Sequence, residues 1–344
     1  MKYKRIRRRH LIDGAFDVLN HFRVFDVLRS INYNNLTVLN YHRVSDPHDP
    51  CCDTFKPNIS ATPEMFDRQL AYIKKSFNIV TAGEIAACAH GTSTLPPRSA
   101  LITFDDGYAD NYTRAYPLLK KHGLGALIFI TTDFVGKSKP SFWDVAAYAF
   151  THTKKTSAVL PLTGETCWSD EAEKQAEMTR WIETLKTVPE EEKQRYAGQL
   201  PAALEVEMDD CAFNHIFMTW DQVREMAANG IEFGSHTLTH PILTRISIEQ
   251  ARYELVESRR LIEQELGKPV ETLAYPNGGQ ADFNPEVIAV AREAGYKLAF
   301  TLMPGSNFFR QLRADPYTIR RVFLSHGDSF PRFVAKVNGI RRIS

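Results

Sequence analysis

Seven short runs of apolar residues recur along the chain, and most are separated by longer segments with the periodicity of helices. Such runs are typical of buried strands, and helices between them imply crossover connections between parallel strands. We therefore expect an α/β fold, a distorted or incomplete (β/α) barrel with about seven parallel strands. The expected strands are Leu36–Tyr41, Ala100–Phe104, Gly125–Ile130, Ile231–Ser235, Thr272–Tyr275, Leu298–Leu302 and Thr318–Leu324.

The alternation is interrupted between about Lys137 and His215. This stretch contains a charged, helix-prone block from Glu171 to Gln199 and no clear strand, so we interpret residues 137–215 as a helical insertion between barrel elements. A lid or a wall of a substrate groove are two roles open to it. We favour a third, a solvated decorative subdomain.

The chain begins with six basic residues among its first nine positions, and apolar residues then recur at roughly helical spacing between Leu11 and Leu28. We expect residues 1–35 to form a basic amphipathic helix, followed by the barrel domain over 36–335 and a basic tail over 336–344. One interpretation packs this helix on the barrel. The other places it peripherally on the anionic inner surface of a membrane.

Composition narrows the classes of function. The 344 residues are 43% hydrophobic, enough for a large core, and the net charge of +1 gives no electrostatic signature of nucleic-acid binding. No run approaches the ~18 apolar residues of a membrane span, and acidic residues interrupt the start where a signal peptide would be apolar. The five cysteines form no Cys-x-x-Cys motif, which favours a reducing, cytoplasmic location.

Two of the expected strands end in groups that suit a metal ion. Asp105 and Asp106 follow Ala100–Phe104, and adjacent buried carboxylates are costly unless a cation or a catalytic role accounts for them. His236 and His240 follow Ile231–Ser235 at a spacing that can bring both imidazoles to one side of a turn. One carboxylate and two histidines leave a coordination position open for water, so we assign Asp106, His236 and His240 as ligands of one divalent ion.

Other polar residues end neighbouring strands. His42 follows Leu36–Tyr41, and Pro276-Asn277-Gly278-Gly279 follows Thr272–Tyr275. The carboxyl ends of barrel strands meet at one face, where barrel enzymes assemble their sites. The shared placement therefore predicts a single active site at that face.

These motifs resemble the polysaccharide deacetylase family, also called the NodB-homology domain or carbohydrate esterase family 4, over roughly Leu36 to Phe333. Thr103-Phe104-Asp105-Asp106-Gly107 is similar to its first motif, and Ser235-His236-Thr237-Leu238-Thr239-His240 to its second. Asn40-Tyr41-His42-Arg43-Val44 and Met218-Thr219-Trp220-Asp221 resemble a bacterial exopolysaccharide-associated branch. The resemblance implies that Asp105 is the catalytic base and that the metal is Zn²⁺ or another divalent ion.

The sequence departs from the family pattern at two motifs. Ala274-Tyr275-Pro276-Asn277 lacks the arginine and the aromatic residue of the third motif, so Arg320 or Arg321 is predicted to orient the base, while the N–H of Asn277 remains available as an oxyanion donor. For the general acid we prefer His42 over His326 of Leu324-Ser325-His326. An ordinary structural role stays open for both histidines.

The resemblance implies hydrolysis of the N-acetyl group of an amino sugar in a polysaccharide, or in a lipid-linked or nucleotide-linked precursor. The expected partners are such a glycan and a divalent metal, with possible contact to an anionic membrane and none to nucleic acid. A deformylase acting on a lipid-linked amino sugar is one alternative. A non-catalytic carbohydrate-binding relic is the other, although the base and all three ligand residues are present.

Overall fold

The fold is a closed ring of seven parallel strands. A computed structural model describes residues 34–49, 54–209 and 211–340. The ring runs in the order β1-β13-β11-β10-β9-β6-β5, and six residue pairs from Leu36↔Ser99 to Tyr41↔Phe104 close it between β1 and β5. All seven predicted strands are present, which confirms the predicted barrel. Their bounds are β1 (Asn35–Tyr41), β5 (Ser99–Phe104), β6 (Leu127–Ile130), β9 (Glu232–Ser235), β10 (Thr272–Ala274), β11 (Leu298–Pro304) and β13 (Ile319–Phe323).

The ring is distorted on one side. β9 and β10 are paired only at Leu273↔Ser235, and the pairing of β11 with β13 shifts register between Phe300 and Pro304. Two short strands extend the sheet beyond the ring: β12 (Asn307–Phe308) pairs antiparallel with β1, and β4 (Asn78–Ile79) pairs parallel with β5. A separate two-residue strand, β2 (Arg43–Val44), pairs with β3 (Ile59–Ala61).

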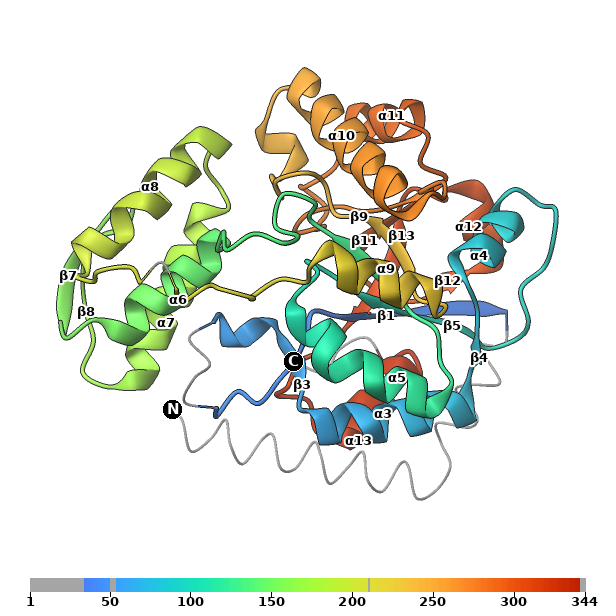
Figure 1. Cartoon of the computed structure of the whole chain (residues 1–344), viewed down its shortest axis with the longest axis horizontal. Helices are drawn as coiled ribbons and strands as arrows, with labels where there is room; N and C mark the ends of the chain where they lie inside the picture. Colours follow the sequence, from blue (N-terminus) through green and yellow to red (C-terminus); the bar gives the residue numbers. More distant parts are fainter. Residues whose placement is uncertain (1–33, 50–53, 210, 341–344) are drawn as a thin grey trace.

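Helices cover the outside of the ring (Figure 1). The Thr62 hydroxyl caps one helix by accepting from the Met65 N–H, and Ser247 and Gly267 bound the longest one. The helices are α3 (Pro63–Ser76), α4 (Ala82–Ala89), α5 (Tyr116–His122), α9 (Trp220–Ala228), α10 (Ile248–Leu266), α11 (Pro285–Glu293), α12 (Phe309–Ala314) and α13 (Phe330–Val337), with a π-turn, η2 (Asn111–Ala115), before α5 and short 3-10 turns η1 (Lys56–Asn58) and η3 (Leu243–Arg245).

Strand alternation divides the core in two. Alternate strand residues such as Val38, Leu101 and Phe129 gather inside the ring, and their neighbours pack outward against the helices. The packing leaves no room for a side chain at Gly234, because a Cβ there would lie 2.7 Å from the Phe129 ring. By the same alternation, Asn40 and Asp105 also face the inside of the ring.

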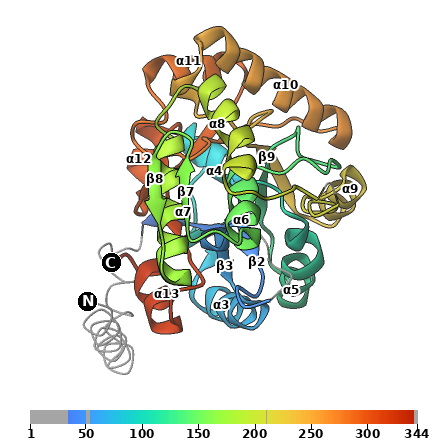
Figure 2. The same cartoon turned by 90° about the vertical axis from the view of Figure 1, so that its left-hand side faces the viewer.

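The insertion has its own core (Figures 1 and 2). Its elements are α6 (Phe142–His152), β7 (Ser157–Leu160), β8 (Gly164–Cys167), α7 (Glu171–Leu185) and α8 (Glu190–Ala203). The antiparallel hairpin β7–β8 was not predicted, because each of its strands has only four residues and β8 contains no apolar run. Trp181 and Leu200 lie in the insertion core, and Phe55 from the barrel side joins them.

Several predictions concern residues outside this description. The basic amphipathic helix of residues 1–35 falls almost entirely on residues 1–33, and its packing and membrane contact therefore stay predictions. The predicted basic tail, residues 336–344, overlaps the end of α13, and its last four residues, 341–344, also lie outside the described ranges. Within the described ranges, no helix is long and apolar enough to cross a bilayer.

Candidate active site

Every strand of the ring contributes to one cavity at the carboxyl end of the barrel. The cavity has a volume of about 250 Å³. The insertion, which follows β6, supplies residues on one side. The other six strands each supply a residue at or just after the carboxyl end, and these are His42, Asp105, His236, Asn277, Leu302 and Phe323. The prediction that the strand-end residues meet at one face therefore matches the observed geometry.

Asp106, His236 and His240 converge in this cavity. Their potential ligand atoms all lie within 4.8 Å of one another, and both Nε2 atoms are 3.5 Å from Asp106 Oδ1. Asp106, at φ 72°, and His240, at φ 65°, adopt the left-handed backbone conformation that non-glycine residues rarely adopt. Such strain at a functional site indicates that the surrounding structure holds the groups in place.

The protonation pattern of the cluster suits a cation. His236 Nδ1 donates to the carbonyl of Ala274 over 2.8 Å, which leaves the lone pair of Nε2 facing Asp106. Burial first, and then the charge of Asp105, raise the pKa of Asp106 well above its usual range. Burial lowers the pKa of His240. Asp106 Oδ1 is buried and accepts no hydrogen bond from any described residue, so the cluster fits a divalent metal ion.

Asp105 is held differently, by an arginine from the opposite end of the chain. Arg321 Nη1 donates to Asp105 Oδ1 over 2.7 Å, and Arg321 is completely buried. Burial alone would raise the pKa of Asp105, but the charges of Arg321, His236 and His42 lower it to about 2. Arg320, the other sequence candidate, is exposed and donates to the Pro304 carbonyl. Asp105 is therefore an ionised carboxylate.

The two candidate acids lie in different places. His42 Nε2 is 3.9 Å from Asp105 Oδ2, and His42 lines the cavity with its ring edge against Phe323. Burial lowers the pKa of His42 to about 4, although the Asp105 charge acts in the opposite direction. His326 is exposed, its Nδ1 is 3.0 Å from the Ile59 carbonyl, and it is not among the residues that line the cavity.

Asn277 lines the cavity and also adopts the left-handed conformation, with φ 62°. Its side-chain amide donates to Asp282 Oδ2 over 2.5 Å. Among the described residues none accepts a hydrogen bond from its backbone N–H. The N–H is therefore available to a ligand.

Two residues that support this site were not predicted from the sequence. Asn40 donates to Asp105 Oδ2 over 3.0 Å, and its position two residues before His42 in a buried strand could have revealed it. The buried carboxylate of Glu254 on α10 accepts from the N–H groups of Leu238 and Thr239, and so it holds the turn between the two histidines. No local signal distinguishes Glu254 from the other glutamates of that helix.

The insertion forms one side of the cavity. Phe142 and Trp143 of α6, three residues of α7 with its C-cap Lys186, and Lys193 of α8 line it together with the barrel residues. Figure 2 shows these helices from the insertion side, in front of the strands. The interpretation of residues 137–215 as a decorative subdomain is therefore wrong. Its charged surface suggested full solvation, but one face of the subdomain is turned to the site.

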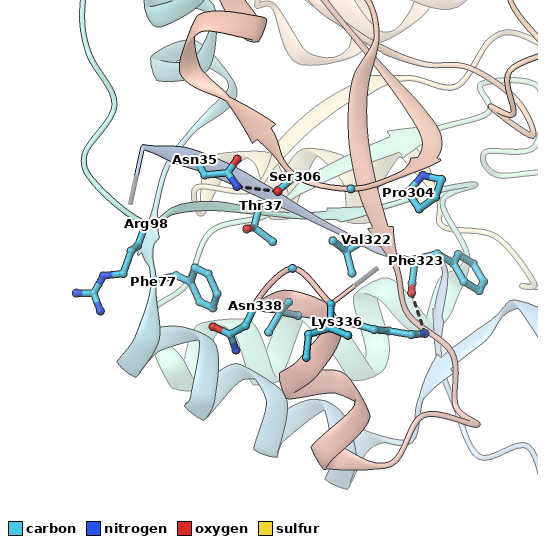
Figure 3. Close-up of a pocket in the computed structure, with 14 residues that line it drawn as sticks. Asn35, Thr37, Phe77, Arg98, Pro304, Ser306, Val322, Phe323, Lys336 and Asn338 are labelled. Atoms are coloured by element: carbon cyan, nitrogen blue, oxygen red, sulfur yellow. Dashed lines mark hydrogen bonds between the residues drawn. The ribbon is translucent and has the colours of Figure 1, made fainter. Parts of the chain in front are cut away.

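A second cavity, of about 230 Å³, lies on the outer wall of the barrel (Figure 3). Thr37 of β1 and Val322 of β13 line it, with Phe77 and the end of α13 opposite. It shares Phe323 with the active-site cavity but contains none of the residues predicted to bind metal or to act in catalysis. None of the predicted chemistry therefore lies in this second cavity.

Known proteins resemble this chain in sequence and in fold. Residues 92–299 match the family model of polysaccharide deacetylases. The chain is 22% identical to YxkH of Bacillus subtilis, a protein assigned to the polysaccharide deacetylases, over 89% of this chain and 77% of that protein. It is also 22% identical to the poly-β-1,6-N-acetyl-D-glucosamine N-deacetylase of Escherichia coli K12, over 89% of this chain but only 39% of that enzyme.

Two solved structures share the fold. One is the deacetylase PplD of Streptococcus pyogenes in complex with acetate, with a TM-score of 0.58 and 17% identity over 89% of this chain and 99% of that one. The other is IcaB of Ammonifex degensii, with a TM-score of 0.57 and 20% identity over 89% and 97% of the two chains.

Proposed function

The chain belongs to the polysaccharide deacetylase family, and we propose that it hydrolyses the N-acetyl group of an amino sugar in a polysaccharide or in a precursor of one. The observation that carries this proposal is the pairing of two buried sites in one cavity. An ionised carboxylate, Asp105, is fixed by Arg321 beside a cluster of Asp106, His236 and His240 that fits a divalent ion. Hydrolysis of an unactivated amide needs both a base and an electrophile.

Asp106, His236 and His240 would hold the metal ion. When bound, a divalent ion there supplies Lewis-acid polarisation of the acetyl carbonyl and lowers the pKa of water. Glu254 keeps the two histidines in register by binding the turn between them. Zn²⁺ is the first candidate, because two imidazoles and one carboxylate with an open position suit it.

Asp105 acts as the general base in this proposal and takes the proton of the attacking water. Arg321 and Asn40 bind one oxygen each of its carboxylate, so the group has a fixed orientation before substrate arrives. This replaces the arginine that the third family motif lacks here. A base held in place by buried partners needs little reorganisation during the reaction.

Asn277 and His42 would complete the reaction. The free N–H of Asn277 donates to the carbonyl oxygen as negative charge develops on it. His42 is neutral at pH 7 because its pKa is lowered to about 4, so it must receive a proton before it can donate one. Protonated Asp105, 3.9 Å away, is the nearest source. The C–N bond then breaks as His42 protonates the amine, which yields acetate and a free amino sugar.

The substrate is proposed from the relatives' names. The Escherichia coli relative acts on poly-β-1,6-N-acetyl-D-glucosamine, and this chain spans 39% of its length. We therefore take an N-acetylglucosamine-type glycan, or its lipid-linked or nucleotide-linked precursor, as the substrate class. A formyl group in place of acetyl would undergo the same chemistry. The complete set of Asp105, Asp106, His236 and His240 argues against a non-catalytic relic.

Mass spectrometry tests the proposal. Zn²⁺-loaded protein is incubated with β-1,6-linked and β-1,4-linked N-acetylglucosamine oligomers and with their N-formyl analogues. Loss of one acetyl group per reacting ring is expected, together with released acetate. Release of formate alone would indicate the deformylase. Intact oligomers after incubation with protein shown to contain metal would contradict hydrolysis of these glycans.

A further inference from the structure

One face of helix α7 is turned into the active-site cavity. Three residues of α7 and its C-cap residue line the cavity at the i, i+3, i+4 and i+7 spacing of a single helical face, and they are Thr179, Ile182, Glu183 and Lys186. Met178, Trp181 and Leu185 are buried in the insertion core, and the fully buried Ile182 belongs both to that core and to the cavity lining. The helix therefore rests on one side against its own subdomain and presents the other to the cavity.

This face of α7 carries groups that suit sugar hydroxyls. Lys186 Nζ is 2.7 Å from Glu183 Oε1, and the two side chains are 24% and 59% exposed, so both stay open to a ligand. A carboxylate accepts hydrogen bonds and an ammonium donates them, and a hydroxyl does both. Lys186 is also close enough to the reaction centre for its charge to contribute to the lowered pKa of His42, for which burial is the main cause.

The side of the cavity formed by α6 and α7 is called the wall below. It also carries aromatic rings, nearer to the cluster of Asp106, His236 and His240. Trp143 packs its ring edge-on against His240, with ring centroids 4.8 Å apart, and Phe142 packs edge-on against Trp143 at 4.7 Å. The Trp143 indole N–H donates to the Tyr108 hydroxyl over 2.7 Å, which fixes the orientation of the ring. A rigid aromatic surface beside polar groups is the usual composition of a small-molecule site, and it costs little conformational entropy on binding.

A buried network ties this wall to the barrel. Asp144 accepts hydrogen bonds from the Tyr108 hydroxyl over 3.0 Å and from the Phe55 N–H over 3.3 Å. Its neighbour Trp143 also binds Tyr108, which lies two residues after Asp106 in the chain. The distance between the wall and the reaction centre is therefore set by the fold.

We propose that Phe142 and Trp143, together with Glu183 and Lys186, form a subsite for the sugar ring that adjoins the amino sugar losing its acetyl group. This inference rests on the proposed N-deacetylase function and names the part of the substrate that the insertion contacts. The floor of the cavity is formed by Asp105 and by the cluster of Asp106, His236 and His240, and it holds the reacting acetyl group. A neighbouring sugar ring in the same cavity therefore lies against α6 and α7. The enzyme then prefers a substrate of at least two rings.

Calorimetric binding tests the subsite without turnover. The probes are N-acetylglucosamine and its β-1,6-linked and β-1,4-linked dimers, titrated into Zn²⁺-loaded Asp105→Asn protein. A dimer is expected to bind about tenfold more tightly than the monomer, as for one hydrogen bond to a charged group. Adding Glu183→Ala and Lys186→Ala should remove that advantage and leave monomer affinity unchanged.

The chain provides a matched control. Arg180 and Glu177 form the same kind of i, i+3 ion pair on α7 but do not line the cavity, so Glu177→Ala with Arg180→Ala should preserve the dimer advantage. Thermal melting verifies that both double variants fold. Equal binding of monomer and both dimers, or a dimer advantage that survives loss of Glu183 and Lys186, would overturn the subsite. Failure of the wild type to deacetylate any dimer would contradict the proposed function, while the binding result would still decide the subsite.

Discussion

The floor and the wall of the cavity are built in different ways. At the floor, Asp105, Asp106 and Arg321 are at most 2% exposed, and their charges depend on one another. On the wall, Glu183 and Lys186, with side chains 59% and 24% exposed, form an ion pair at the C-terminal end of α7. Buried charges have large effects when one partner is removed, whereas surface ion pairs contribute about 1 kcal/mol or less. The floor is therefore suited to chemistry, and the wall can change without loss of the fold.

The largest effect is expected from removing two metal ligands at the floor. The double variant His236→Ala, His240→Ala should lose both the bound ion and all measurable deacetylation, because one carboxylate cannot hold a divalent ion alone. Elemental analysis of purified protein measures metal per chain. Wild-type protein treated with a chelator should behave in the same way and recover on adding Zn²⁺. Unchanged metal content in the double variant would refute the assignment.

Replacing the base should separate chemistry from metal binding. Asp105→Asn keeps the size of the side chain but removes its basic oxygen, so kcat should fall by about 10⁴-fold. Metal content should stay at the wild-type level, because Asp106 and the histidines are untouched. Single-turnover rates together with elemental analysis test both parts. Near-normal kcat with metal bound would exclude Asp105 as the base.

The two candidate acids differ in position: His42 lines the cavity, whereas His326 lies outside it. His42→Ala should lower kcat by about 10²- to 10⁴-fold, since His42 is the cavity histidine beside Asp105, the proposed source of its proton. His326→Ala should leave kcat within a factor of about two, because His326 lies on the surface away from the cavity. Steady-state kinetics of both variants decide the matter, and the reverse pattern would assign the acid to His326.

Measurements of the free energy of unfolding should detect the coupling between Asp105 and Arg321. Arg321→Met leaves the Asp105 charge buried without its main partner, and the free energy of unfolding should fall by about 3–5 kcal/mol. Adding Asp105→Asn removes that charge and should restore most of the loss. Urea unfolding of the two single variants and the double variant measures the coupling. Additive losses would mean that the two residues do not depend on each other.

The smallest effect is expected at the wall. Lys186→Ala should change the free energy of unfolding by less than about 1 kcal/mol, as should Arg180→Ala on another part of the same helix. Urea unfolding of both variants measures this. A loss at Lys186 comparable to that at Arg321 would show that the wall, too, is structural, and it would remove the distinction between the two regions.

Sequence patterns alone predicted much of the floor. Each apolar run became a strand of the ring, and because the ends of parallel strands share one edge, Asp106 and His236 could be placed together across 130 positions. The hairpin β7–β8 was not predicted because both of its strands are short and β8 has no apolar run. The insertion was misjudged because periodicity shows that a helix has a polar face, but it does not show what that face meets.

The sequence by itself determined which residues can react; the tertiary structure decided which of them meet. Arg320 and Arg321 are equal candidates in the sequence, and only the pairing of β13 in the ring turns Arg321 inward to Asp105 and leaves Arg320 in solvent. A shift of one residue in a strand would exchange their faces. Asn40 and Glu254 reach the site in the same way, through register and packing between segments far apart in the chain. Local periodicity encodes the elements, whereas these contacts exist only once the ring has closed.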